Sequence, residues 1–391
     1  MKLRKFASAS VVLALSVLGL TLALQIDDNL EPGARQWIAD VEQRIGSVEE
    51  PYLLLLGMGV AADEEPRSVA LAHFEKYEAL IADADTLAEG IVLDAGELHA
   101  LAHPEGAMFC PDDGALCPAL LEAETDTLTA VLHEHSALLQ RYRELLQHPV
   151  VITPTTPHLI EPYPPISYTM SGQRLHHMST LLEIRQGAAD TALRRLLDEH
   201  YQLRSQLAHA DSIVFKLVMV AMLERNLELL AHIQATQPEI SLARLPRLTR
   251  EERSLELPMA RELTMVAYLY RGMDRHPQFF STTDESLAQP APAWLVRALF
   301  KPNMSINNSY YRYRAVADLS ISPLTDGDKS GGAIAPGLNR SWWSTARNAA
   351  GSILSDIAQP EFGPQIERIH ELDRKIRSLN AAGAPSTTVI R

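Results

Sequence analysis

Apolar residues recur with a helical period along most of this chain. Positions three and four apart share one face of an α-helix, so the pattern predicts helices with one apolar side. Helices are predicted over residues 34–45, 52–58, 69–81, 118–147, 168–187, 190–209, 211–235, 249–271, 294–300 and 365–379. Short links between successive helices favour antiparallel neighbours. The expected fold class is therefore all-α, a helical bundle or a short α-solenoid-like domain.

Several details of these helices follow from single residues. Pro118 is expected to open the longest helix. Pro258 is expected to kink the helix that begins with a capping box at Thr249–Glu252. Asp211 is expected to cap the helix over residues 211–235. The first half of that helix is apolar nearly all round, which predicts a central helix surrounded by others.

The N-terminus has a different pattern, an uncharged stretch from Phe6 to Leu24 between basic and acidic residues. As a helix rising about 1.5 Å per residue it would reach roughly 28 Å, close to the hydrocarbon thickness of a bilayer. Basic flanking residues stay on the cytoplasmic side, so the rest of the chain should be exported. The sequence predicts a single-pass protein of the bacterial inner membrane, anchored through residues 6–24, with its C-terminal domain in the periplasm.

This interpretation divides the chain into four parts. They are an N-terminal membrane anchor or uncleaved signal over 1–28, an N-terminal helical region over 29–152, a Pro-rich connector over 153–166 and a C-terminal helical region over 167–391. The connector should run extended across the surface, and residues 29–33 should form a short hinge. The alternative for the first part is a cleaved signal peptide, with the small residues Thr21 and Ala23 before the cut.

Composition narrows the range of partners. The 391 residues include 35 Lys and Arg against 49 Asp and Glu, a formal net charge of −14. An acidic surface repels nucleic-acid phosphates, so no nucleic-acid partner is expected. The hydrophobic share of 46% and charged share of 21% are those of a globular protein.

Two cysteines, Cys110 and Cys117, flank a short stretch rich in Pro, Asp and Gly. Such a stretch can turn back on itself, so a disulfide is predicted in an oxidising periplasm. A redox pair is one alternative, although redox pairs usually have the tighter C-x-x-C spacing. A zinc site that also uses His99 and His103 is the other.

Sequence motifs of common enzyme classes are missing. The chain contains no G-x-S-x-G, G-x-x-x-x-G-K-[ST], G-x-G-x-x-G or H-E-x-x-H, the signals of many hydrolases, nucleotide-binding proteins and zinc proteases. His133 and His135 lie about 200° apart around a predicted helix, so they cannot share a metal ion. We predict no cofactor and no metal, and favour a non-catalytic role.

Lys216 is a candidate binding residue because it interrupts the apolar run Ile213–Leu223. A charge in such a run is costly unless it has a partner. Lys216 could line an interhelical pocket and bind an anionic ligand group. The alternatives are an ion pair with a neighbouring helix, or a side chain that reaches out to solvent.

A second group of candidate binding residues combines amide, aromatic and cationic side chains: Asn303, Asn307, Tyr311 and Arg312. Such a mixture is typical of a surface that recognises a partner or a glycan. Asn side chains also bind exposed backbone well, so a local turn framework is the alternative.

Four short motifs carry a resemblance to known sequences. They are the pair Cys110 and Cys117, then Leu139-Gln-Arg-Tyr-Arg-Glu-Leu-Leu146, Lys301-Pro-Asn-Met-Ser-Ile-Asn307 and His370-Glu-Leu-Asp373. Together they look like a group of uncharacterised bacterial envelope proteins, single-anchor and α-helical, with no assigned activity. The resemblance covers most of the chain and implies the same location and architecture. The group continues past the equivalent of Arg391, and no catalytic residue transfers from it.

Three functions from different classes remain. The first is a non-catalytic, membrane-anchored periplasmic protein that acts through contacts with an unidentified envelope protein. The second is a periplasmic binder of an apolar or anionic small molecule in an interhelical pocket near Lys216. The third is a membrane-tethered hydrolase.

Overall fold

The computed structural model describes residues 15–16, 19, 21–83, 93–110, 116–237, 242–275, 292–322, 341–357 and 361–382. Throughout these residues the regular secondary structure is helical, which confirms the all-α prediction. The predicted membrane span over residues 6–24 lies mostly outside them, and residues 323–340 lie entirely outside them. In the parts described, no helix has both the length and the apolar character needed to cross a bilayer.

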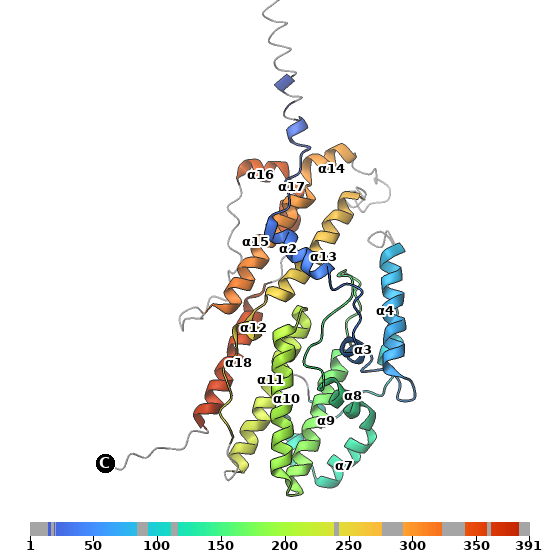
Figure 1. Ribbon diagram of the computed structural model, residues 1–391, viewed down its shortest axis with the longest axis vertical. Coiled ribbons are helices and arrows are strands. Elements are labelled where there is room, and N and C mark those ends of the chain that lie inside the picture. The colour runs from blue at the N-terminus through green and yellow to red at the C-terminus, as the bar shows by residue number, and fades with distance from the viewer. Residues whose placement is uncertain are drawn as a thin grey trace, which may run out of the picture.

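One half of the molecule is built around two long central helices (Figure 1). Its helices are α6 (Pro118–Glu122), α7 (Thr125–Glu134), α8 (Ser136–Leu145), α9 (Ile166–Arg185), α10 (Ala189–His209), α11 (Ile213–Thr236) and α18 (Gly363–Ala382). α9 packs against α7, α8 and α10, while α11 packs against α10 and α18. α9 ends before Gly187, whose φ of +83° is readily adopted only by glycine.

The other half contains the helices around the end of the predicted anchor (Figure 1). Its helices are α2 (Pro32–Glu42), α12 (Arg250–Arg253), α13 (Glu256–Arg275), α14 (Ala293–Leu299), α15 (Pro302–Ile321), α16 (Trp342–Arg347) and α17 (Ala349–Ile357). α2 packs on α13 and α15, which are far away in sequence.

A smaller layer covers the side of the molecule. It consists of α3 (Glu50–Leu56), α4 (Pro66–Asp83) and the 3-10 turns η1 (Gly96–His99) and η2 (Ala107–Phe109). α3 packs on both α4 and α8. Tyr52, Leu56 and Phe74 form a small core of their own between α3 and α4.

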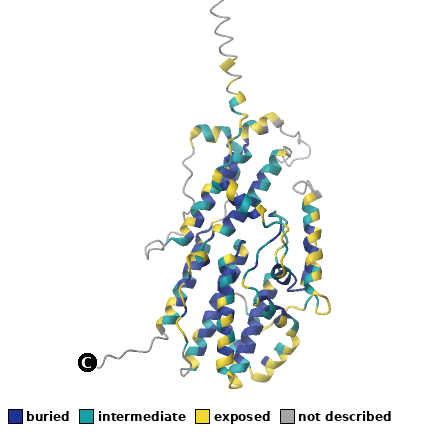
Figure 2. Ribbon diagram, in the orientation of Figure 1, coloured by how far each residue is buried: buried dark blue, intermediate teal, exposed yellow. Residues whose placement is uncertain are grey.

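A single large hydrophobic core runs through the molecule (Figure 2). It includes Trp37 of α2, Tyr142 of α8, Leu223 of α11, Val316 of α15 and Ile369 of α18. Residues from both predicted helical regions, 29–152 and 167–391, therefore share it. α11 is the surrounded central helix that its apolar sequence predicts, with buried residues on every side.

Several predicted boundaries are wrong. Residues 118–147 form three helices, because the chain turns out of helical geometry at Ala123 and again at His135. The capping box at Thr249 and Glu252 is present, but its helix ends at Arg253. Pro258 lies in the first turn of the next helix, α13, where no backbone N–H is needed, and so it produces no kink.

The N-cap of α11 is Ser212, whose hydroxyl accepts the N–H of Phe215, and not Asp211 as predicted. The Asp211 carboxylate instead accepts hydrogen bonds from the backbone N–H and the hydroxyl of Thr153, at 3.1 and 2.8 Å. Asp211 therefore fixes the start of the Pro-rich segment against the start of α11.

The Pro-rich segment is packed between helices and does not run across the surface as predicted. Thr155 is fully buried, and Pro154 accepts a hydrogen bond from the N–H of Gly46. Glu78 of α4 accepts from both the N–H and the hydroxyl of Thr156, each at 2.8 Å. The segment thus joins α4 to the main body.

Candidate functional site

The first turn of α15 binds the segment that precedes α2. The Asp27 carboxylate accepts hydrogen bonds from the backbone N–H groups of Asn303 and Met304, at 2.8 and 3.2 Å. The N-cap residue of α15, Lys301, makes no capping side-chain bond. Asp27 therefore supplies the cap that the helix sequence lacks.

Two of the candidate binding residues continue this contact. The Asn303 amide donates to the backbone oxygen of Asp28 at 3.0 Å. The Asn307 amide donates to the backbone oxygen of Asn29 at 2.9 Å and accepts from the N–H of Glu31 at 2.8 Å. The turn-framework alternative was right in that these amides bind backbone, but the backbone belongs to a distant segment. Residues 29–31 are held in place and do not form the predicted hinge.

The other two residues of this group also bind the protein's own helices. A hydrogen bond to Glu31 is the main reason that the pKa of Tyr311 rises to about 12. Arg312 donates to the backbone oxygen of Ser355 at 2.8 Å and forms an ion pair with Asp356, both in α17. All four residues thus lie on one helix and hold neighbouring segments against it.

Lys216 lies apart from that group, in the first turn of α11. Its side chain is buried, and its Nζ donates to the backbone oxygens of Leu207 and Glu251, at 2.6 and 3.3 Å. Burial lowers its pKa to about 7, and the negative charge of Glu252 partly opposes that shift. Lys216 therefore joins α11 to α10 and α12 through carbonyl groups and does not reach solvent.

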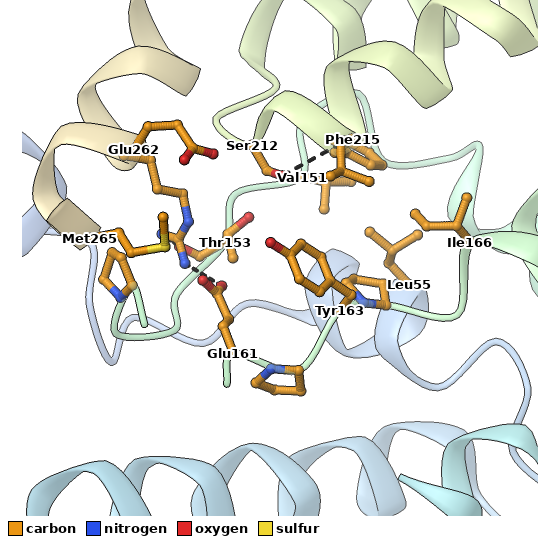
Figure 3. A pocket seen from close by; sticks show the side chains of 15 residues that line it. Leu55, Val151, Thr153, Glu161, Tyr163, Ile166, Ser212, Phe215, Glu262 and Met265 are labelled. Carbon is orange, nitrogen blue, oxygen red and sulfur yellow. Dashed lines mark hydrogen bonds and ion pairs between the residues drawn. The ribbon is translucent and has the colours of Figure 1, made fainter. Parts of the chain in front are cut away.

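A crevice lies where α3, the Pro-rich segment, α11 and α13 meet (Figure 3). Most of its lining is apolar, including Leu55, Pro157, Pro162, Pro164, Phe215 and Met265. Lys216 is not among the lining residues, although its neighbour Phe215 is. The crevice is open on one side, where Tyr163 is 57% exposed.

Tyr163 extends into the middle of this crevice (Figure 3). The carboxylates of Glu161 and Glu262 lie on one side of its ring, and the apolar side chains of Leu55 and Ile166 on the other. The crevice therefore has an acidic wall and an apolar wall. Such a surface favours a group that is both apolar and cationic.

The carboxylate of Glu161 is already satisfied within the protein. It forms an ion pair with Arg261 and accepts a hydrogen bond from the Thr155 hydroxyl. Arg261 also donates to the backbone oxygens of Thr153 and Thr155, at 3.3 and 3.0 Å. This network holds the Pro-rich segment against α13, and so it forms the floor of the crevice.

Glu262 differs from Glu161 in this respect. None of the described residues donates a hydrogen bond to its carboxylate or forms an ion pair with it. Burial, followed by the negative charge of Glu161, raises its pKa, and the charge of Arg261 only partly offsets these effects. The Glu262 carboxylate is only partly buried and has no donor among the described residues, so it is available to pair with a cationic ligand in the crevice.

The crevice offers few groups for catalysis. Its lining residues include no histidine or cysteine, and the Ser212 hydroxyl serves as the helix cap of α11. Within the described ranges, no group of three or more His, Cys, Asp or Glu is placed to hold a metal ion.

The predicted disulfide between Cys110 and Cys117 is present. The disulfide leaves no thiolate at this position for zinc. His99 and His103 instead pack against the ring of Tyr168, with ring centres 5.9 and 4.9 Å apart. The zinc alternative therefore does not describe this loop.

A buried polar network joins α8, α9, α10 and α11, and the helical pattern of the sequence did not predict it. The fully buried Glu199 carboxylate accepts from the Tyr142 hydroxyl at 2.6 Å and from the Asn226 amide at 2.8 Å, and pairs with His177 at 3.0 Å. Asn226 also bonds to the ring of His200 at 3.1 Å. Glu199 lies between Leu196 and Leu203 on the apolar face of its helix. A carboxylate at such a position is the sequence feature that could have indicated the network.

This network has no access to solvent, because Tyr142, His177 and Glu199 are all buried. Burial by itself raises the pKa of Glu199, but the charges of His177 and His176 and the hydrogen bonds lower it to about 2. Buried networks of this kind specify how helices pack. We therefore assign it a structural role.

Comparison with known protein families, with curated proteins and with solved structures gives no match to this chain.

Proposed function

We propose that this chain is a membrane-anchored bacterial envelope protein whose helical body acts in the periplasm by binding another protein, without catalysis. The contact site is the crevice between the Pro-rich segment, α11 and α13. The observation that carries the proposal is Glu262, a partly buried carboxylate that faces an apolar crevice and has no donor among the described residues.

The lining suggests which part of a partner would bind. Proline and aromatic side chains offer rigid apolar surfaces at little cost in conformational entropy. Tyr163 and Met265 can contact an apolar side chain, and Glu262 can pair with a Lys or Arg beside it. A partner segment with adjacent apolar and basic residues fits these groups, and the chain's charge of −14 would attract it.

Crosslinking in intact cells tests this contact. A photoreactive phenylalanine analogue at position 163 should capture a partner protein, and the same analogue at the exposed Tyr201 of α10 should not. Glu262→Gln should strongly reduce the adduct at 163, whereas Glu134→Gln, on the exposed face of α7, should leave it unchanged. Equal adducts at both positions, or an adduct that ignores Glu262→Gln, would reject the crevice as the contact site.

The membrane location has its own test. Alkaline phosphatase is active only after export, so a fusion after residue 40 should be active in cells. The proposal rests on the basic residues before the uncharged stretch at 6–24 and the acidic residues after it. An inactive fusion would reverse the topology.

A small-molecule binder is the second candidate, because the same crevice is largely apolar. Its carboxylates favour a cationic ligand over the anionic one expected near Lys216. A long-chain alkyl amine should then raise the melting temperature of the protein, and an alkyl carboxylate of equal length should not. No shift with either probe would remove this candidate.

A further inference from the structure

Two short helices of this protein expose large apolar side chains. Trp294 of α14 is 66% exposed and Trp342 of α16 is 79% exposed. Leu295 and Leu299 of α14 are also exposed, while Val296 and Phe300 are buried in the body. α14 is therefore apolar on its outer as well as its inner side. Exposed apolar groups gathered in this way mark an interaction surface.

These helices lie where the N-terminal segment joins the body (Figure 1). The Gln25 amide donates to the backbone oxygen of Trp294 at 3.3 Å. Arg347 of α16 donates to the backbone oxygen of Ile26 at 2.6 Å and pairs with Asp28 at 2.9 Å. α14 and α16 also contact each other. Both helices are thus fixed within a few residues of the end of the uncharged stretch at Leu24.

The charge of the two helices differs from that of the whole chain. Neither α14 nor α16 contains an Asp or Glu, and each contains an arginine, Arg297 or Arg347. The nearest carboxylates of the N-terminal segment are already engaged, since Asp27 caps α15 and Asp28 pairs with Arg347. The Arg347–Asp28 pair is neutral, but Arg297 is exposed, which makes this surface of a chain with a net charge of −14 suited to anionic headgroups.

We propose that α14 and α16 lie in the interface of the bilayer, with Trp294 and Trp342 at the level of the lipid headgroups. Tryptophan is enriched at this level because its ring is apolar and its N–H can bond to headgroups and water. Short helices that carry Trp, Leu and Arg bind in the plane of the interface. The inference rests on the membrane anchor of the proposed function. It adds that the body is held against the bilayer in one orientation.

Fluorescence quenching by brominated lipids tests this proposal on the full-length protein. The protein is reconstituted in vesicles of phosphatidylcholine and phosphatidylglycerol that carry bromine near the headgroup end of the acyl chain. Quenching is expected in the wild type and should be largely lost in a triple variant in which Trp294, Trp342 and the neighbouring Trp343 are replaced by phenylalanine. Trp37, buried in the core, should give an unquenched background. A tryptophan added by Tyr201→Trp, on the exposed face of α10, should add only unquenched emission.

The outcomes separate this inference from the anchor. Flotation with the vesicles together with quenching of Trp294 and Trp342 supports it. Flotation without quenching overturns it and leaves the anchor standing. Failure to float rejects the anchor, and the interfacial surface with it. If both tryptophans are shielded from aqueous quenchers in native membranes but unquenched in protein-free vesicles, a partner protein covers them and the inference is also overturned.

Discussion

The Asp27 carboxylate accepts the backbone N–H of Asn303, a residue 276 positions further along the chain, at 2.8 Å. A helix start leaves N–H groups without partners, and a residue directly before the helix normally provides one. Here the cap comes from the segment that leaves the predicted membrane anchor. The orientation of the body relative to that anchor is therefore coupled to the stability of α15.

Asp27→Ala should lower the free energy of unfolding by about 1 kcal/mol, the usual cost of losing a helix cap. Asp27→Asn should cost less than Asp27→Ala, because its single amide oxygen can keep the bond made by one carboxylate oxygen but not the bond made by the other. Burial raises the pKa of Asp27, which means that the site does not favour the charged form of the carboxyl group. Removing the negative charge should therefore cost little by itself. Urea unfolding measures both variants.

The control for this prediction is Asp63→Ala, at an exposed aspartate for which no hydrogen bond is seen. Hydrogen exchange adds a local test, because Asp27→Ala should speed exchange at residues 28–31 and leave α11 protected. Equal stabilities of Asp27→Ala and Asp63→Ala would mean that the cap contributes nothing.

Replacing both Cys110 and Cys117 by serine should cost about 2–3 kcal/mol, since the bond closes only a short loop. Arg174 of α9 donates to the backbone oxygen of Cys110 at 2.8 Å, so part of the loop stays attached without the disulfide. Denaturant unfolding with and without a reductant measures the cost. The reductant should destabilise only the wild type, and its failure to do so would show that the bond does not contribute.

The helical periods predicted most of the fold because most helices have one continuous apolar face. α15, in contrast, was not predicted as a helix. Ser305, Asn307 and Ser309 are buried on it among apolar neighbours, so its sequence has no clear apolar period. Two of these polar groups bind other segments: the Ser305 hydroxyl accepts from the Asn348 amide at 3.0 Å, and Asn307 binds the backbone of Asn29 and Glu31.

The candidate site shows a similar limit. Asn303 and Asn307 were recognised as side chains that bind backbone, but nothing local identifies a partner segment 275 positions or more away. The importance of Glu262 was missed for the same reason, because its crevice is formed by segments from α3 to α13. A single sequence records which residues are unusual, whereas long-range packing determines what they touch.

Glu199→Ala should cost about 3–5 kcal/mol, because it leaves buried donors of three other helices without an acceptor. Glu183→Ala is the matched control. Glu183 forms an ion pair with Arg195, and each of the two side chains is 27% exposed. Such a pair should contribute less than about 1 kcal/mol. Urea unfolding at pH 7 compares the two variants, and a similar loss in both would contradict the structural role of the network.

The same carboxylate predicts a response to acid. The pKa of Glu199 is about 2 in the folded protein against 4.5 as the ordinary value. Its stabilising contribution should be complete above pH 4.5 and should disappear as the pH falls from 4.5 to 2. Acid unfolding followed by circular dichroism should therefore be steeper in the wild type than in Glu199→Ala. Parallel acid curves would refute this assignment.

Lys216→Met should stabilise the protein at neutral pH. The folded pKa of Lys216 is about 7 against an ordinary value of 10.5, so the folded state disfavours its charge. This cost is absent above pH 10.5, grows as the pH falls toward 7 and is constant below that. The full shift corresponds to about 4–5 kcal/mol. Losing the two carbonyl contacts offsets about 2 kcal/mol, which leaves a net gain of about 2–3 kcal/mol at pH 7.

Urea unfolding of Lys216→Met at pH 7 and pH 10 measures this difference, and the gain at pH 7 should exceed the gain at pH 10. Lys76→Met, at an exposed position on α4, should show no such dependence on pH. If Lys216→Met instead destabilises the protein equally at both pH values, the carbonyl contacts of Lys216 outweigh its desolvation. The side chain would then be a stabilising link between α10, α11 and α12.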